Sequence, residues 1–548
     1  MSRNGSGDGP GEASGAPPAR SAHGVDGSAS SRSEADAASG GGAGDPLEMD
    51  PETMRRLGYR AVDMLVERIA GLEDEPTWRG ESRPSLERRL RESPPAGPAS
   101  DPGALLDRLA DDVLAVAGRI DHPRFFAFIP GCPTWPGILG DFLAAGFNVF
   151  QGTWLESAGP SALELIVLDW FKEWIGYPAD AAGVLVSGGS AANLDALVCA
   201  REASRTPDGG EAGDHDGDAA DAAPGIVYLS DQTHSSVERA ARIAGYTADR
   251  IRTLPTDESY RFRPDALHAA IEEDVRAGRR PVLVVANAGA TNTGAVDPLP
   301  ALADVCRERG VWLHVDAAYG GYAVLSERGR TLLEGIERAD SVTLDPHKWL
   351  YQPYEAGCLL VRDGRRLDDA FHIMPDYLQD TDTRRHAGND GGAAWWRGGV
   401  NFADRGLQLT RATRAVKIWL SLQTFGVDAF RATIDRCFDL ALHAQRRIED
   451  SPTLELLSPA RFGIVCFRRR PADTGEVGRS ADPTTEERLD RINESLVERL
   501  SRSGVGMISS TRLDGRYALR LCILNHRSRV EDVDRVLDWL AAAPIERA

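Results

Sequence analysis

Lys348 is the residue whose type and position point most directly to chemistry. It comes shortly after the apolar run 341–344, which predicts a buried strand, and the 548-residue chain contains only three lysines. Burial disfavours the charged form of an amine, and an uncharged amine can attack a carbonyl group to form a Schiff base. Lys172, on an amphipathic segment, and Lys417, beside other cations, are both expected at the solvated surface. A reaction that needs an amine would therefore use Lys348.

A glycine turn, Gly188-Gly189-Ser190, lies between an apolar strand and a predicted helix. Glycine lets the backbone approach an anion closely, and the free N–H groups at a helix start attract phosphate. The turn matches neither the Walker pattern nor G-x-G-x-x-G. A phosphate cradle and a plain tight turn with a helix N-cap are both open interpretations.

Two further polar residues follow predicted strands. Asp316 comes directly after the apolar run 311–315, where it could hold a positive charge inside a pocket, although a helix N-cap is the alternative. The small residues Ala317 and Ala318 beside it leave room for a flat ring. His234 follows the run 226–229, in a turn where histidine is more often a capping or packing residue. Its functional interpretation depends on the other segments.

Strands alternate with helices through the middle of the chain, which predicts an α/β fold with a mostly parallel sheet covered on both faces. In such sheets, ligands bind beyond the carboxyl ends of the strands, where the segments described above lie. The expected strands are 226–229, 282–286, 311–315 and 341–344, and the expected helices are 161–174, 191–204, 235–244, 264–277 and 299–309.

The chain divides by composition into four parts. Of the first 45 residues, 32 are Gly, Ser, Ala or Pro, so we expect a disordered tail. A helical arm is expected over 46–122 and a large α/β domain over 123–413, with an acidic insertion at 206–224. A long helix, two β-like runs (462–467 and 517–523) and a closing helix at 530–540 predict a small α+β domain over 414–548.

Composition excludes several classes of function. The net charge of −20 disfavours nucleic acid and anionic membrane surfaces as partners. No apolar run approaches the roughly 18 residues that span a bilayer, and no secretory signal opens the chain. Seven widely spaced cysteines without a C-x-x-C pair argue against disulfides or a zinc site. We therefore expect no metal, and we expect a cytoplasmic location.

A phosphate cradle, an acid, an imidazole and a Schiff-base lysine are together what pyridoxal 5'-phosphate (PLP) requires. Asp345-Pro346-His347-Lys348-Trp349, with the segments 316–319 and 231–236, closely resembles the group II PLP-dependent amino-acid decarboxylases, and within them the aromatic-L-amino-acid decarboxylases. The resemblance runs in order over about residues 50–540 and includes 122–126 and 376–378. It implies PLP fold type I, the aspartate aminotransferase-like architecture with a seven-stranded sheet, and a homodimer with active sites at the interface.

The resemblance also implies a role for each matching residue. Lys348 would hold the cofactor as an internal aldimine, and Asp316 would pair with its pyridine nitrogen. His234 and Ala318 would lie on opposite faces of the ring, with Thr291 near it. The residues expected around the phosphate are Gly188, Gly189, Ser190 and His347.

The implied reaction is loss of CO2 from an L-amino acid, through a quinonoid intermediate, to give the amine. Tyr377, on a loop expected to be mobile over about 371–392, matches the tyrosine that returns a proton to Cα; without the resemblance it would be interpreted as a loop-anchoring aromatic. Relatives that release an aldehyde typically carry phenylalanine at that position or lack the stacking histidine. Oxidative decarboxylation-deamination is therefore the alternative, and Tyr377 with His234 favours plain decarboxylation.

The sequence departs from the family at three places. Asp345 stands where animal members carry Asn, Gly131 replaces a family Thr, and Gly152 replaces a family Phe. Phe150 and Trp154 keep the expected substrate pocket aromatic. An aromatic L-amino acid is the predicted substrate, with an acidic or aliphatic one as alternative. A scaffold with a relict site and a nucleotide-binding protein fit less well, because Lys348 and Asp316 are present and the glycine turn lacks the Lys-Ser/Thr of a triphosphate site.

Overall fold

The computed structural model describes residues 45, 47–97, 101–205, 225–373, 376, 381, 398–471 and 483–545. Contacts divide the chain into two compact units, residues 1–61 and 62–548, and the architecture below belongs to the second. Nearly all of the expected tail, the whole acidic insertion and most of the expected mobile loop, with Tyr377, lie outside the described residues. The domain boundaries predicted at 123 and 414 fall inside the second unit and stay predictions.

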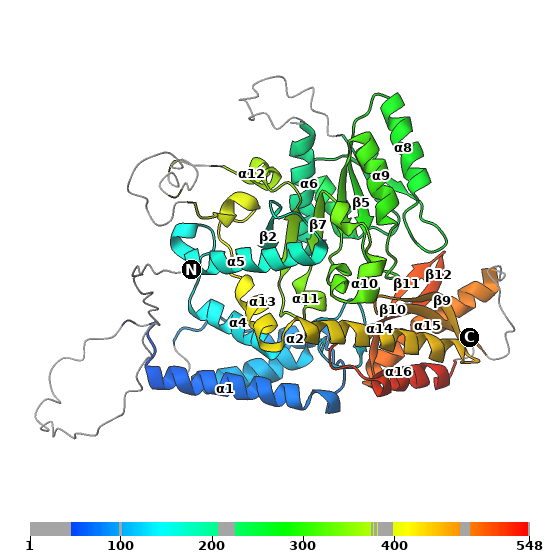
Figure 1. The fold of residues 1–548 in the computed structure, drawn as a ribbon. Coiled ribbons are helices and arrows are strands. Elements are labelled where there is room, and N and C mark those ends of the chain that lie inside the picture. The colour runs from blue at the N-terminus through cyan, green and yellow to red at the C-terminus, as the bar shows by residue number, and fades with distance from the viewer. Residues whose placement is uncertain are drawn as a thin grey trace, which may run out of the picture. The chain divides into compact units, whose positions relative to one another are not determined.

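A seven-stranded sheet forms the centre of the second unit (Figure 1). Its strands pair in the order β2-β8-β7-β6-β5-β3-β4, and β8 runs opposite to the other six strands. The predicted α/β fold with a mostly parallel sheet is thus confirmed. The strands are β2 (Ala182–Val186), β3 (Ile226–Ser230), β4 (Ile251–Leu254), β5 (Pro281–Asn287), β6 (Trp312–Asp316), β7 (Ser341–Leu344) and β8 (Gly357–Val361).

Register in this sheet decides which polar residues meet. Asn287 at the end of β5 pairs with Asp316 at the end of β6, and Asp316 pairs with Thr343 of β7. Parallel strands end at the same edge of a sheet, so these residues and the glycine turn after β2 share one edge. The continuous burial of β3, β5, β6 and β7 matches strands that are covered on both faces.

Helices cover the sheet, and α6 contacts β5, β6, β7 and β8. Figure 1 shows α8 and α9 beside β5, as their contacts require. All five helices predicted for this region are present. Four of them begin and end within two residues of the expected bounds, whereas α5 begins seven residues earlier than expected. The helices are α4 (Trp135–Gly146), α5 (Trp154–Ile175), α6 (Gly189–Arg205), α7 (Ser235–Ile243), α8 (Pro264–Arg276), α9 (Leu299–Arg309), α10 (Glu327–Leu332), α11 (Pro346–Trp349) and α12 (Arg365–Phe371).

A second sheet has five strands in the order β1-β11-β12-β10-β9. Four of its strands come from the C-terminal part of the chain, and β1 comes from the start of the predicted large domain. The predicted long helix at 414 is two helices, because the chain turns at Gly426 with φ +72°. The elements are β1 (Phe125–Phe126), α13 (Ala415–Phe425), α14 (Val427–Glu449), β9 (Leu454–Arg461), β10 (Ile464–Arg469), α15 (Pro483–Ser503), β11 (Met507–Leu513), β12 (Arg516–Cys522) and α16 (Val530–Ala542).

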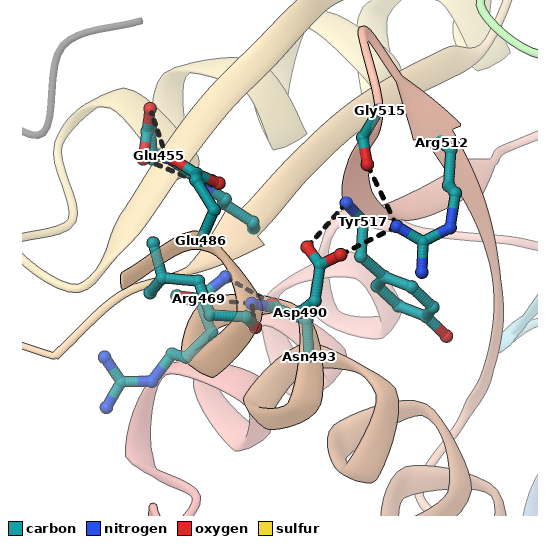
Figure 2. A network of polar contacts seen from close by, with 10 residues as sticks. Glu455, Arg469, Glu486, Asp490, Asn493, Arg512, Gly515 and Tyr517 are labelled. Carbon is teal, nitrogen blue, oxygen red and sulfur yellow. Dashed lines mark hydrogen bonds and ion pairs between the residues drawn. The ribbon is translucent and has the colours of Figure 1, made fainter. Parts of the chain in front are cut away.

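Polar contacts fix α15 to this sheet (Figure 2). The carboxylate of Asp490 accepts hydrogen bonds from the Tyr517 backbone N–H at 2.8 Å and from the Arg512 guanidinium at 2.7 Å. One turn on, Asn493 exchanges side-chain hydrogen bonds with the backbone of Arg469 on β10. These contacts satisfy backbone groups at the edges of the strands that would otherwise be unpaired.

The expected N-terminal helical arm contains α1 (Pro51–Ala70), α2 (Arg83–Leu90) and α3 (Pro102–Arg108), and α3 continues into a π-helical turn, Leu109–Val113. α1 begins in the first unit and ends in the second. No helix among the described residues is long and apolar enough to cross a membrane.

Candidate active site

A cavity of about 290 Å³ opens at the carboxyl edge of the seven-stranded sheet. All nine residues predicted to contact a cofactor line it, although they come from five separate stretches of the chain. Of the four predicted catalytic residues, three line the cavity and Tyr377 lies outside the described residues. The predicted lining residues are Gly188, Gly189, Ser190, His234, Thr291, Asp316, Ala318, His347 and Lys348.

Lys348 projects into this cavity from the short helix α11, directly after β7. Its ammonium group lies 2.9 Å from the Asp345 carboxylate, and 19% of its side chain is exposed. The other two lysines are less exposed than predicted: Lys417 is 3% exposed and pairs with Asp141 at 3.0 Å, and Lys172 is 13% exposed. The prediction that they are solvated was wrong for Lys417, because α13 packs against α4 and buries its whole side chain.

The glycine turn leads directly into α6, whose first residue is Gly189. A Cβ atom on Gly189 would lie 2.9 Å from the Ala318 Cβ, and one on Gly357 would lie 2.4 Å from the Gly188 Cα. Side chains would therefore close the space that the turn leaves open. The first backbone N–H groups of a 17-residue helix have no partners within the helix, and they face an anion favourably through the helix dipole.

Asp316 is held in place from α6. Its Oδ2 accepts a hydrogen bond of 2.9 Å from the Asn193 side-chain amide, and its Oδ1 accepts one of 3.1 Å from the Ala318 backbone N–H. Thr343 and His314 in turn contact the Asn193 oxygen at 2.8 and 3.0 Å, which fixes the orientation of the amide. The carboxylate is 7% exposed and lines the cavity, so it is oriented to hold a positive charge there.

The same amide connects Asp316 to His234. Asn193 Nδ2 also donates to the Ser236 hydroxyl at 3.0 Å, and that hydroxyl lies 2.8 Å from His234 Nδ1. The Ser236 backbone N–H donates to the same ring nitrogen, so His234 is the N-cap of α7. Because Nδ1 accepts these bonds, the hydrogen of the neutral ring is assigned to Nε2. The capping and functional interpretations of His234 are therefore compatible.

Burial keeps His314, which contacts Asn193, and His347, which lines the cavity, uncharged. His314 is fully buried, and desolvation lowers its pKa to about 4. Burial likewise lowers the pKa of His347, whose Nδ1 accepts a hydrogen bond from the Ala356 backbone N–H. Neutral imidazoles can accept and donate hydrogen bonds without adding charge to the cavity.

Arg520 of β12 holds the loop that carries Thr291. Its guanidinium donates to the carbonyls of Thr291, Asn292 and Phe128 at 2.6, 3.1 and 2.6 Å, and the residue is 3% exposed. The five-stranded sheet thus helps to build the cavity of the other sheet. Sequence patterns gave no signal for this contact, because it joins residues about 230 positions apart.

The two glycines that replace larger family residues are tightly enclosed. A Cβ on Gly152 would lie 2.5 Å from the Phe150 ring and 2.6 Å from the Leu409 carbonyl oxygen. A Cβ on Gly131 would lie 2.7 Å from the Tyr354 hydroxyl. Neighbouring groups therefore occupy the space that a family side chain would need at both positions.

Comparison with known proteins agrees with this geometry. Residues 98–470 match the family model described as the pyridoxal-dependent decarboxylase conserved domain. An aromatic-L-amino-acid decarboxylase of Bacillus atrophaeus is 40% identical over 90% of this chain and 95% of its own length. The chain belongs to the pyridoxal-dependent decarboxylase family. It is thus a PLP-dependent amino-acid decarboxylase, a carboxy-lyase, with the predicted fold type I architecture.

Other members of the pyridoxal-dependent decarboxylase family are similar over nearly the whole chain. The crystal structure of Oryza sativa TDC with PLP and tryptamine superposes with a TM-score of 0.79 at 30% identity, covering 91% of this chain and 99% of the other. A phenylacetaldehyde synthase of Arabidopsis thaliana is 31% identical over 88% of this chain and 94% of its own length. The relatives thus include proteins named as decarboxylases and as aldehyde synthases.

The residues of this decarboxylase cavity suit PLP. The glycine turn leaves an opening at a helix N-terminus for the phosphate, Lys348 offers the amine, and Asp316 offers a carboxylate for a protonated ring nitrogen. Residues that line the cavity without having been predicted to contact a cofactor are Ser187, Asn193, Ser236, Asn287, Gly289, Tyr319 and Asp345. Asn287 could have been found from its place at the end of a predicted strand, one strand away from Asp316.

Proposed function

We propose that this enzyme removes CO2 from an aromatic L-amino acid and releases the corresponding amine. The observation that carries the proposal is the convergence of Lys348, Asp316, His234 and the glycine turn in one cavity, in a chain 40% identical to an aromatic-L-amino-acid decarboxylase. The solved relative that contains tryptamine supports an aromatic substrate. Phe150 and Trp154, retained at the expected substrate pocket, support it as well.

The residues that line the cavity would each bind a different part of the cofactor. PLP, when bound, supplies an electron sink for the charge left at Cα after CO2 departs. Lys348 would hold the cofactor, and Ser190 and His347 would bind its phosphate together with the Gly188 and Gly189 backbone. Asp316, oriented by Asn193, would hold the proton on the pyridine nitrogen and so keep the ring electron-poor.

The remaining roles concern the ring faces and proton return. His234 would stack on one face of the ring, with its Nε2–H turned toward the cavity because Nδ1 is engaged by Ser236. Ala318 would pack against the other face, with Thr291 nearby. Tyr377, expected on a mobile loop at 371–392, would return the proton to Cα.

Oxidative release of an aldehyde is the second candidate, favoured by the phenylacetaldehyde synthase among the relatives. Tyr377 and His234 together argue for the amine, because aldehyde-forming relatives typically lack one of the two residues. An assay of purified enzyme with PLP, offering aromatic, acidic and aliphatic L-amino acids in turn, separates the candidates. Amine and CO2 in equal amounts from an aromatic acid would support the proposal, whereas peroxide with aldehyde and ammonia would contradict it.

We also propose that the enzyme is a homodimer in the cytoplasm. Three large apolar side chains at the end of α4 are exposed, namely Phe142 (63%), Leu143 (48%) and Phe147 (80%), and a second copy of the chain would cover them. All seven cysteines are unbonded and buried, which suits a reducing compartment.

A further inference from the structure

Asp345 places a carboxylate at the end of the cavity where the phosphate of PLP would bind. It lies between β7 and α11, three residues before Lys348, and is 2% exposed. A Cβ atom on Gly189 would lie 3.1 Å from Asp345 Oδ2, so the carboxylate touches the backbone of the glycine turn. An acidic side chain thus borders the proposed phosphate position.

Little positive charge compensates this carboxylate. Its Oδ2 lies 2.9 Å from the Lys348 ammonium group and 3.5 Å from His347 Nε2. Burial lowers the pKa of His347, so the basic side chain that pairs most closely with Asp345 in the described part of the chain is that of Lys348. Its Oδ1 is buried and has no hydrogen-bond partner there.

The other titratable groups that face Asp345 are uncharged. Tyr322 and Cys358 are fully buried, and the pKa of each is raised far above its usual range, first by burial and in part by the Asp345 charge. The pKa of Tyr354, which packs on the His347 ring with 5.0 Å between ring centroids, is raised for the same reasons. None of these groups neutralises the carboxylate.

We propose that Asp345 weakens the binding of the cofactor's phosphate and thereby sets how strongly the enzyme prefers PLP over unphosphorylated pyridoxal. A phosphate dianion at the N-terminus of α6 would be attracted by the helix and repelled by a carboxylate bordering the same glycine turn. An asparagine, as animal members carry here, would give the attraction without the repulsion. The inference rests on the proposed placement of PLP in this cavity.

Affinity measurements on the apoenzyme with two ligands test this proposal. The ratio of the Kd for pyridoxal to the Kd for PLP isolates the phosphate contribution, because loss of the Asp345–Lys348 ion pair affects both ligands alike. In Asp345→Asn this ratio rises about tenfold or more over that of the wild type, through tighter PLP binding, because a like charge has been removed from a poorly solvated site. Asp345→Glu, which keeps the charge, leaves the ratio within about threefold of the wild type.

Asp363→Asn is the matched control, because it makes the same substitution two residues after the end of β8, at a residue that does not line this cavity. In this variant the ratio stays at the wild-type value. Asp345→Ser removes the charge with a smaller side chain if asparagine disturbs the fold, and pyridoxal binding shows that the site is intact. An unchanged or lower ratio in both charge-removing variants overturns the proposal. A wild-type enzyme that binds PLP without involving Lys348 would instead overturn the proposed function.

Discussion

The Asn193 side-chain amide donates a 2.9 Å hydrogen bond to Asp316 Oδ2 and a 3.0 Å hydrogen bond to the Ser236 hydroxyl. Asn193 is 1% exposed, and its carbonyl oxygen is occupied by Thr343 and His314, so the amide has a single orientation. One residue of α6 therefore positions both the carboxylate proposed for the ring nitrogen and, through Ser236, the imidazole proposed for the ring face. It is a positioning residue.

Asn193→Ala should lower kcat/KM by about 10- to 100-fold, in the range of supporting residues around a catalytic group. Without the amide, the carboxylate of Asp316 keeps its charge but loses its fixed direction, so the ring nitrogen is less firmly protonated. The absorbance spectrum of the bound cofactor, recorded against pH, should change together with the rate. A variant with reduced rate and a wild-type spectral titration would show that Asn193 only supports the fold.

Tyr377→Phe should reduce amine formation and raise aldehyde and ammonia, while the consumption of substrate continues. The phenol is proposed to return the proton to Cα, and a phenylalanine keeps the ring without the proton. Product analysis by mass spectrometry, with oxygen consumption followed in parallel, checks this result. Unchanged amine yield would remove Tyr377 from the proton-transfer step.

The buried carboxyl group of Asp195 should make the free energy of unfolding depend on pH. Burial raises its pKa to about 7, and its Oδ1 has no hydrogen-bond partner among the described residues. Below pH 4 the carboxyl is protonated in the folded and unfolded chains. Between pH 4 and 7 only the unfolded chain releases this proton, so the folded state of the wild type loses stability as pH rises, by about 4 kcal/mol at most.

Asp195→Asn removes that loss. The variant should gain stability over the wild type progressively from pH 4 to 7, with the difference constant above pH 7. Urea unfolding at several pH values measures it, and the exposed Asp180→Asn provides the comparison. A difference between Asp195→Asn and wild type that does not vary with pH would show that Asp195 keeps its charge balanced in the folded state.

Replacing Phe142 and Phe147 by Asp should turn a dimer into a monomer of low activity. The two side chains are 63% and 80% exposed, and charges there would oppose the burial of this surface against a second copy. Light scattering after size-exclusion chromatography gives the mass. Ile243→Asp, at a 66% exposed position on α7, should leave the mass unchanged. A wild-type enzyme that is already monomeric would contradict the dimer.

Much of the fold could be predicted because buried parallel strands appear as continuous apolar runs. The run 341–344 matches β7, and the runs 226–229 and 282–286 begin and end within one residue of β3 and β5. β4 was missed because two of its four residues are Arg252 and Thr253, and β8 because it begins at Gly357 within a turn-rich stretch. Local pattern carries no information on strand pairing.

The site was predicted to the extent that its residues follow strands. Lys348, Asp316 and His234 each occupy such a position, and the structure brings them into one cavity. Asn193 and Arg520 were not assigned roles, because their functions depend on contacts across more than a hundred residues of sequence. Lys417 was placed at the surface because its cationic neighbours in sequence gave no sign of the α4 helix that covers it.

Trapping the cofactor chemically tests the central claim most directly. Borohydride reduction of the enzyme with bound PLP converts a lysine–cofactor bond into a stable one, and peptide mass spectrometry then locates the label. With three lysines in the chain, the outcome is unambiguous. We expect one phosphopyridoxyl group, on Lys348, and none after Lys348→Ala. A label on Lys172 or Lys417, or no label on an enzyme that still decarboxylates, would contradict it.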